Sequence, residues 1–177
     1  MDGSKLTDLA RNLRIILLDV DGVMTDGGII LMGSEGEAKR FHVQDGIGIS
    51  LAQSVGLQVG IITSRVSTVV ERRAKELKID QLIQGASKKL EALEGLLSDL
   101  GFQAGQCAYL GDDIQDLPVL QSVGMPIAVQ NAVAEVKVNS LFITQKCGGD
   151  GAVREAVEWL LELRGDLTSA RDKVSGL

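Results

Sequence analysis

Short runs of apolar, mostly β-branched residues alternate along the chain with stretches whose apolar residues recur at helical spacing. We expect buried strands at residues 14–18, 57–63, 81–84, 106–110, 126–129 and 141–144. One helix is expected to begin at Asp45, its N-cap, and run to about residue 55, and another to begin at Ser87, its N-cap, and run to about residue 100. Further helices are expected at residues 65–78, 115–123, 132–138 and 152–161. Strands that alternate with helices predict an α/β fold with a doubly wound, mainly parallel sheet.

Two stretches depart from this alternation. Residues 28–32 and 38–43 flank the segment GSEGE at 33–37, which predicts a β-hairpin. Residues 165–177 are polar and predict a loose tail. We find no repeat, linker or low-complexity segment, so residues 1–177 are interpreted as one domain with a small hairpin flap.

Composition narrows the classes of function. The 177 residues carry a net charge of −6, which repels phosphate backbones and disfavours nucleic acid as a partner. Aromatic residues make up only 3%, so a base-stacking surface is not expected. No apolar run reaches ~18 residues, so we expect no membrane span. Cys107 and Cys147 do not form a disulfide framework, and a reduced, cytoplasmic compartment fits them better.

Chemically active residue types follow four of the predicted strands. The first strand leads into DVDGVMTDG at 19–27, and the second into Thr63, Ser64 and Arg65. Residues 85–89, which end in two lysines, follow the third strand, and GDDIQD at 111–116 follows the fourth. Ligands of doubly wound sheets bind at the carboxyl ends of the strands. Carboxylates beside a lysine and a hydroxyl indicate Mg²⁺ and a phosphate group, because Mg²⁺ prefers carboxylate oxygens and bridges to phosphate.

This set of motifs, in this order, resembles the haloacid dehalogenase superfamily of phosphotransferases over about residues 14–161. The resemblance implies that Asp19 is a nucleophile that forms an aspartyl-phosphate and Asp21 is the general acid/base. It further implies that Thr63 binds the phosphoryl oxygens and Lys89 neutralises charge. The implied metal ligands are Asp19, the backbone carbonyl of Asp21, and Asp112, with Asp113 supporting metal-bound waters.

Simpler interpretations stay open for several of these residues. Asp113 and Asp116 are also suited to capping the following helix. Either Lys88 or Lys89 could be the motif lysine, and Lys89 matches the lysine–leucine step of the superfamily better. His42 is the only histidine, so zinc is unsupported and a hairpin residue near the mouth of the site is the favoured interpretation.

The spacing leaves no room for a cap domain, since 41 residues separate Asp21 from Thr63 and 22 separate Lys89 from Asp112. The segments GEAKRFHVQDGIGI, GIITSR and GGDGAVRE are similar to those of superfamily members that cleave 3-deoxy-D-manno-octulosonate 8-phosphate on the way to lipopolysaccharide. Arg65 favours this eight-carbon acid sugar over nine-carbon 9-phosphates, whose phosphatases tend to carry Glu there. Ser64 departs from the usual Gly. The expected substrate contacts are Thr25, Ser64, Arg65 and Arg73.

The resemblance also implies a homotetramer in which neighbours complete each site. Ile29, Ile30 and Leu31 are consecutive, so at least one faces away from any single core. Arg73 or residues 148–151 are expected near a neighbour's site, and the tail is expected to order only with ligand. The alternatives are a sialic-acid-type 9-phosphate phosphatase, a catalytically silent oligomerisation module, and a monomer with a mobile flap.

Overall fold

A six-stranded parallel sheet forms the centre of the molecule. The computed structural model describes residues 3–33 and 36–176. The strand order is β5–β4–β1–β6–β7–β8, and every pairing is parallel. The strands are β1 (Ile15–Leu18), β4 (Gln58–Ile62), β5 (Gln81–Ile83), β6 (Cys107–Gly111), β7 (Met125–Ala128) and β8 (Phe142–Ile143). The predicted parallel α/β sheet is therefore confirmed.

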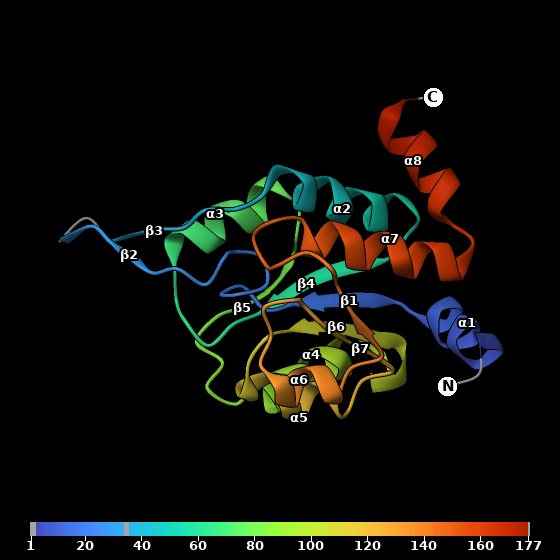
Figure 1. Cartoon of the computed structure of the whole chain (residues 1–177), viewed down its shortest axis with the longest axis horizontal. Coiled ribbons are helices and arrows are strands. Elements are labelled where there is room, and N and C mark those ends of the chain that lie inside the picture. The colour runs from blue at the N-terminus through green and yellow to red at the C-terminus, as the bar shows by residue number, and fades with distance from the viewer. Residues whose placement is uncertain (1–2, 34–35, 177) are drawn as a thin grey trace.

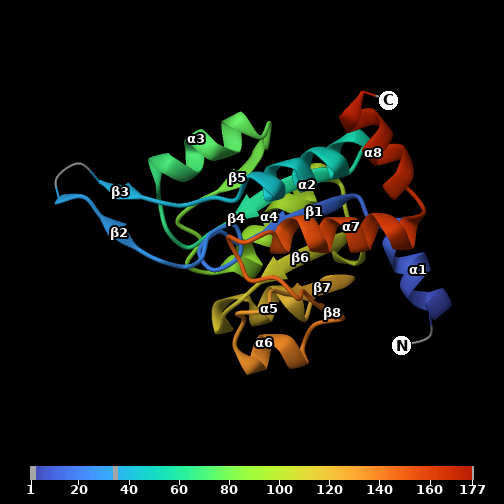
Figure 2. The same cartoon turned by 45° about the horizontal axis from the view of Figure 1, so that its top comes forward.

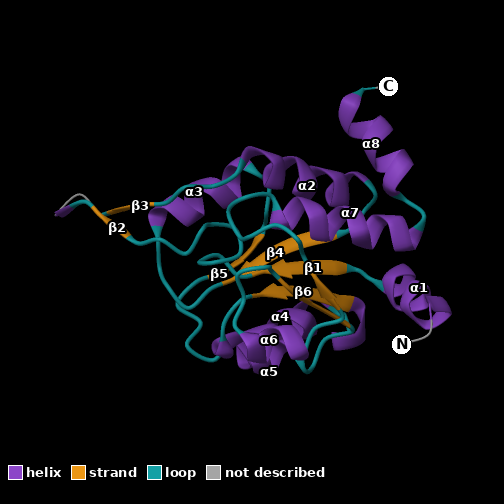
Figure 3. Ribbon diagram, viewed as in Figure 1, coloured by secondary structure: helices purple, strands orange, loops and turns teal. Residues whose placement is uncertain are grey.

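Helices cover both faces of this sheet (Figures 1 and 3). One layer contains α2 (Val43–Ser54), α3 (Thr68–Glu76) and α7 (Ala152–Arg164). The other contains α4 (Lys89–Leu100), α5 (Leu117–Leu120) and α6 (Ala134–Val138), and the short 3₁₀ helices η2 (Ala104–Gln106) and η3 (Ile114–Asp116) lie in connections. The sequence analysis did not foresee α1 (Gly3–Asn12), which packs against α7. No helix in the described part of the chain is long and apolar enough to cross a membrane.

The central strand and the last long helix supply much of the core. All four residues of β1 are fully buried, as expected for a strand with helices on both sides. One face of α7, within the helix predicted at residues 152–161, is also buried, namely Ala152, Val153, Ala156, Val157, Leu160 and Leu161. The boundaries of the predicted strands and helices in the sheet and its two helical layers differ from the observed ones by a few residues.

A thin hairpin projects from the body, with β2 (Ile30–Leu31) pairing antiparallel to β3 (Glu37–Ala38) (Figures 1 and 2). Its strands are shorter than predicted, and part of the predicted turn, residues 34–35, lies outside the described residues. Ile29, Ile30, Leu31 and Met32 are each more than half exposed. The flap therefore presents an apolar surface that its own chain does not cover.

Two predicted helix caps are wrong. The N-cap of α2 is His42, so Asp45 lies in the first turn of the helix. There the buried carboxylate of Asp45 accepts a hydrogen bond of 2.9 Å from the backbone N–H of Arg154, which ties α2 to α7. Lys88 and not Ser87 occupies the N-cap of α4. Gly101 ends α4 in the left-handed conformation, which agrees with the prediction of a helix that runs to about residue 100.

The predicted loose tail is also wrong, because most of it forms helix α8 (Leu167–Ser175). This helix packs against α2 and α7, and Ala170 is fully buried in the contact. Arg171 bonds to Glu158 at 3.0 Å, and the ammonium of Lys173 donates to the carbonyl of Ser54 at 3.2 Å. These partners belong to the same chain, and the expectation that the tail orders only with ligand stays a prediction.

Candidate active site

The loop that follows β1 is held in shape by its own polar groups. The buried hydroxyl of Thr25 donates to the carbonyl of Val20 at 3.3 Å and accepts from the backbone N–H groups of Gly22 and Gly27 at 3.4 and 3.2 Å. Gly22 has φ +89°, a left-handed conformation that glycine adopts without strain. Thr25 thus shapes the loop, and its role as a substrate contact stays a prediction.

A second segment supports this loop from outside. The side-chain amide of Asn131 donates to the carbonyl of Gly22 at 2.9 Å and accepts from the backbone N–H of Gly148 at 2.6 Å. A Cβ atom on Gly148 would lie 1.8 Å from the carbonyl oxygen of Gly22. Gly148 and Gly149 therefore pack on the catalytic loop of their own chain, in a space that no side chain fits.

The strand ends converge on a cavity of about 210 Å³. It is lined by Asp19, Asp21, Thr63, Ser64, Arg65, Lys89, Asp112, Asp113, Gln115 and Asp116. The structure thus brings together the candidate residues that follow β1, β4 and β6, as the parallel topology predicts. Thr25 and Arg73 are not among the lining residues.

Lys89 is the lysine of this site. Its buried ammonium group lies 2.9 Å from Oδ1 of Asp19 and 2.7 Å from Oδ1 of Asp116. Lys88 is exposed and pairs with Glu91 at 2.6 Å on the surface. Of the two lysines that the sequence left open, Lys89 and not Lys88 contacts the carboxylate of Asp19, which favours Lys89 as the motif lysine.

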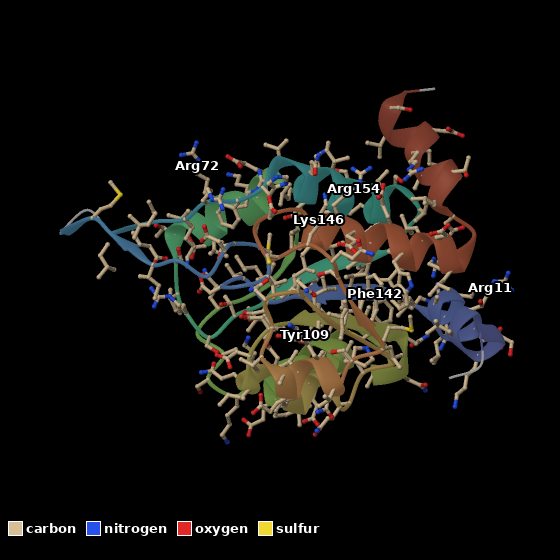
Figure 4. The ribbon with its side chains drawn as sticks, in the orientation of Figure 1. Arg11, Arg72, Tyr109, Phe142, Lys146 and Arg154 are labelled. Atoms are coloured by element: carbon tan, nitrogen blue, oxygen red, sulfur yellow. The ribbon has the colours of Figure 1, made fainter. Side chains whose placement is uncertain are left out.

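Asp116 accepts four hydrogen bonds, two at each carboxylate oxygen. Oδ1 accepts from Lys89 and from the phenol of Tyr109, both at 2.7 Å. Oδ2 accepts from the backbone N–H groups of Asp112 and Asp113 at 2.9 and 3.3 Å. Tyr109 is fully buried on β6 and lies within the body of the protein (Figure 4). The contact of this phenol with Asp116 could not be foreseen from the sequence, because it depends on the geometry of the turn that follows β6.

The helix-cap interpretation also holds in part. The carboxylate of Asp113 accepts from the N–H of Ile114 at 2.7 Å and closes a capping box with Asp116. Asp116 thus orients the helix start and the ammonium of Lys89 together. Since both its oxygens are already bonded, the carboxylates of Asp19 and Asp112 are the freer metal ligands.

Burial raises the pKa of two carboxyl groups that line this cavity. Burial raises the pKa of Asp19 from 3.8 to about 6, with Lys89 opposing the rise and Asp116 adding to it. Burial, followed by the charges of Asp19 and Asp116, raises the pKa of Asp112 from 3.8 to about 7. Oxygens of Asp19, Asp112 and Asp116 lie within 4.8 Å of one another. This unbalanced negative charge on hard oxygen donors fits a Mg²⁺ ion.

Two cations hold the carboxylate of Asp21. The ammonium of Lys39, at the base of the flap, is buried and forms an ion pair with Oδ1 of Asp21. On the other side, Nε of Arg65 lies 3.6 Å from Oδ2 of Asp21. Glu37 joins the two, with Lys39 at 3.6 Å and Arg65 at 2.7 Å. Asp21 is therefore fixed by both the flap and the loop after β4.

The sequence analysis missed Lys39 and Glu37. A signal was present, because residues two apart in a strand point to the same face. That signal does not say which face of the hairpin meets Asp21, since the approach of the flap to the sheet is a tertiary feature.

Arg73 and His42 lie away from the cavity. The guanidinium of Arg73 lies over the ring of Phe41 at 5.6 Å and bonds to Glu76 at 3.4 Å. Nε2 of His42 lies 3.9 Å from Asp150. Neither residue lines the cavity, so a substrate contact by Arg73 stays a prediction.

Comparisons with known proteins find relatives that are similar to this chain in sequence. Residues 79–155 match the haloacid dehalogenase-like hydrolase family. The chain is 43% identical over 163 residues to 3-deoxy-D-manno-octulosonate 8-phosphate phosphatase of Escherichia coli K12, covering 92% of this chain and 86% of the relative. The Yersinia pestis enzyme of the same name is 42% identical over 168 residues, covering 94% and 86%.

Solved structures show the same similarity. The phosphatase of that name from Moraxella catarrhalis, in complex with magnesium ion, phosphate ion and a KDO molecule, is 42% identical with a TM-score of 0.89, covering 94% of this chain and 95% of that one. A putative hydrolase of the haloacid dehalogenase superfamily from Legionella pneumophila is 36% identical with a TM-score of 0.92, covering 98% and 96%.

Proposed function

The chain belongs to the 3-deoxy-D-manno-octulosonate 8-phosphate phosphatases of the haloacid dehalogenase-like hydrolases, and on this premise we propose that it releases phosphate from that sugar phosphate in lipopolysaccharide precursor synthesis. The observation that carries the proposal is the pairing of Asp19 with Lys89 beside Asp112 in one cavity. It is a Mg²⁺-dependent phosphomonoester hydrolase that works through an aspartyl-phosphate.

Asp19 is the proposed nucleophile. An oxygen of its carboxylate forms a bond to phosphorus while the bond from phosphorus to the sugar oxygen breaks. The ammonium of Lys89, 2.9 Å from the carboxylate, offsets the charge that gathers there. The buried hydroxyl of Thr63 is placed to bond to the phosphoryl oxygens.

Asp21 is the proposed general acid and base. It protonates the leaving sugar oxygen, then takes a proton from the water that attacks phosphorus and frees Asp19. Lys39 and Arg65 hold its carboxylate between them. This positioning matters because a proton is transferred efficiently only within hydrogen-bond reach.

We assign the Mg²⁺ ligands to Asp19, Asp112 and the backbone carbonyl of Asp21, with Asp113 supporting bound waters. When bound, the cation offsets the repulsion between the carboxylates and an anionic phosphoryl group. The raised pKa values of Asp19 and Asp112 support this assignment, because a nearby cation favours their charged forms.

Arg65 is our candidate for the sugar carboxylate. Its guanidinium is partly exposed, lines the cavity and is suited to bidentate bonding with a carboxylate. Ser64 lies beside it at the mouth. Thr25 and Arg73, outside the cavity of one chain, would contribute through the loop and at a neighbour's site respectively.

We further propose that the protein works as a homotetramer in the cytoplasm. The exposed apolar residues 29–32 of the flap, with Val66 and Ile114 exposed beside the mouth, supply a surface for other subunits. The unpaired Cys107 and Cys147 suit a reducing compartment. Light scattering at micromolar concentration tests the assembly, and a monomer mass would exclude the tetramer.

The decisive experiment compares phosphate release from four substrates with Mg²⁺ and with EDTA. They are 3-deoxy-D-manno-octulosonate 8-phosphate, a sialic-acid-type 9-phosphate, glucose 6-phosphate and p-nitrophenyl phosphate. We expect the eight-carbon acid sugar to have the highest kcat/KM and EDTA to abolish turnover. A preference for the 9-phosphate would replace the proposed substrate, and inactivity on all four would favour a silent oligomerisation module.

A further inference from the structure

Two uncharged polar side chains meet at the mouth of the cavity. Oγ of Ser64, in the loop after β4, lies 2.9 Å from Oε1 of Gln115, in the turn after β6. The two residues are 51 positions apart in the chain, and both line the cavity. The contact therefore joins two separate loops across the opening.

The Ser64 hydroxyl has one proton and lies between two acceptor oxygens, so Oε1 of Gln115 shares this donor with a second oxygen. The same Oγ lies 3.1 Å from the backbone carbonyl of Ala86, which is buried. Because Oε1 of the carboxamide contacts Ser64, the NH₂ group of Gln115 is left to donate to other partners. A side-chain amide bonds to hydroxyls as both donor and acceptor.

The position of Gln115 suits the sugar more than the phosphate. The phosphate end of the cavity is defined by the buried Asp19, Thr63 and Lys89, whereas Gln115 is exposed. The cavity, at about 210 Å³, is smaller than the ~300–1,000 Å³ of common small-molecule sites. An eight-carbon sugar must therefore extend past the mouth. Gln115 also borders an adjoining hollow of about 390 Å³.

We propose that Gln115 is a specificity-determining residue that bonds to hydroxyl groups of the sugar, and that Ser64 is its positioning residue. This inference rests on the proposed function, because it concerns the leaving group of that reaction. It gives the hydroxyl of Ser64 a role that a glycine at this position would lack. The phosphate is bound by other residues, so a leaving group without hydroxyls gains nothing from the pair.

The test compares Gln115→Met, Ser64→Ala and the double variant on 3-deoxy-D-manno-octulosonate 8-phosphate and on p-nitrophenyl phosphate. We expect Gln115→Met to lower kcat/KM for the sugar phosphate about three- to tenfold, the worth of one hydrogen bond, mainly through KM. Turnover of p-nitrophenyl phosphate should stay within twofold and serves as the check on folding. Ser64→Ala should have a smaller effect that disappears in the Gln115→Met background.

Gln121→Met is the matched control, since Gln121 is exposed and bonds to Asn139 away from the cavity. Equal losses on both substrates would give Gln115 a scaffold role and overturn the inference, as would unchanged kinetics on the sugar phosphate. Additive effects of the two substitutions would overturn the positioning role of Ser64. A wild-type enzyme that does not prefer the sugar phosphate would overturn the proposed function and this inference together.

Discussion

At the scale of single residues, the site concentrates negative charge that burial makes costly. Asp19 and Asp112 both have raised pKa values, and Lys89 is the buried cation that pairs with Asp19. Such a cluster is stable only when each buried charged group has hydrogen-bond partners. Asp116 is the partner of Lys89, and it also accepts a hydrogen bond from Tyr109. The chemistry therefore depends on residues that never touch the substrate.

Replacing the proposed nucleophile should lower turnover without unfolding the protein. Asp19→Asn keeps the shape of the side chain but removes its nucleophilic charge, so kcat should fall by at least ~10² while the fold survives. Phosphate release and circular dichroism measure the two properties. The matched control is Asp99→Asn on the exposed side of α4, which should leave kcat unchanged. Near-normal turnover of Asp19→Asn would exclude an aspartyl-phosphate.

Lys39 should affect turnover because it holds the carboxylate of Asp21 in place. Lys39→Met removes the buried ammonium that holds the carboxylate of Asp21, so kcat should fall roughly ten- to a hundredfold, the equivalent of ~1.5–3 kcal/mol for a charge-assisted bond. KM should change less, because the cavity is lined by Arg65 and not by Lys39. Lys88→Met, at an exposed lysine, is the control. A change in KM alone would place Lys39 in substrate binding instead.

Three of the proposed active-site residues were predictable because each directly follows its strand. Asp19, Thr63 and Asp112 could be placed at one sheet edge from the sequence alone. Lys39, Tyr109 and Gln115 could not, since each reaches the site through a hairpin, a core position or a turn whose geometry the sequence does not display.

At the scale of elements, the catalytic loop depends on close backbone packing. Gly148→Ala would place a methyl group 1.8 Å from the carbonyl of Gly22, so the loop that carries Asp21 must move. We expect a loss of ~1–3 kcal/mol in the free energy of unfolding, as for other overpacked sites, and a clear loss of kcat. Thermal unfolding and phosphate release provide the measurements.

Gly95→Ala provides the contrast. Gly95 lies inside α4 with open space where its Cβ would be, so alanine there should raise stability by ~0.5–1 kcal/mol and leave kcat unchanged. If Gly148→Ala changed stability and kcat as Gly95→Ala does, the close packing of Gly148 against the loop that carries Asp21 would matter for neither property.

The sequence was least informative where an element buries little. Helix α8 has one fully buried residue, Ala170, and its polar composition therefore predicted a tail. By contrast, the six inward-facing residues of α7 made that helix evident. Caps were misplaced at Asp45 and Ser87 because a suitable residue type near a helix start does not fix the first turn.

At the scale of the whole molecule, stability should depend on pH and Mg²⁺ together. Folding raises the pKa of Asp19 to about 6 and of Asp112 to about 7, from 3.8 for each. Between these values and 3.8 the folded state holds more protons than the unfolded state, so rising pH destabilises the metal-free protein. Mg²⁺ binds the ionised forms, so its stabilising effect should grow as the pH rises.

Thermal unfolding of EDTA-treated protein at pH 5.5 and pH 8, with and without Mg²⁺, checks this expectation. The increase in Tm caused by Mg²⁺ should be larger at pH 8, and Asp112→Asn should reduce it strongly. An equal increase at both pH values would show that the cation does not compete with protons for these carboxylates.

The central position of β1 in the sheet affects how the chain folds during its synthesis. β1 leaves the ribosome before the other strands of its sheet, yet its sheet neighbours are β4 and β6, and Cys107 of β6 follows Leu18 by 89 residues. At ~5–20 residues per second, the second edge of β1 waits roughly 5–20 s for its partner. During that interval the apolar residues 15–18 have an unpaired edge, which favours aggregation. We therefore expect the nascent chain to be most prone to aggregation before β6 is synthesised and Asp112 arrives beside Asp19.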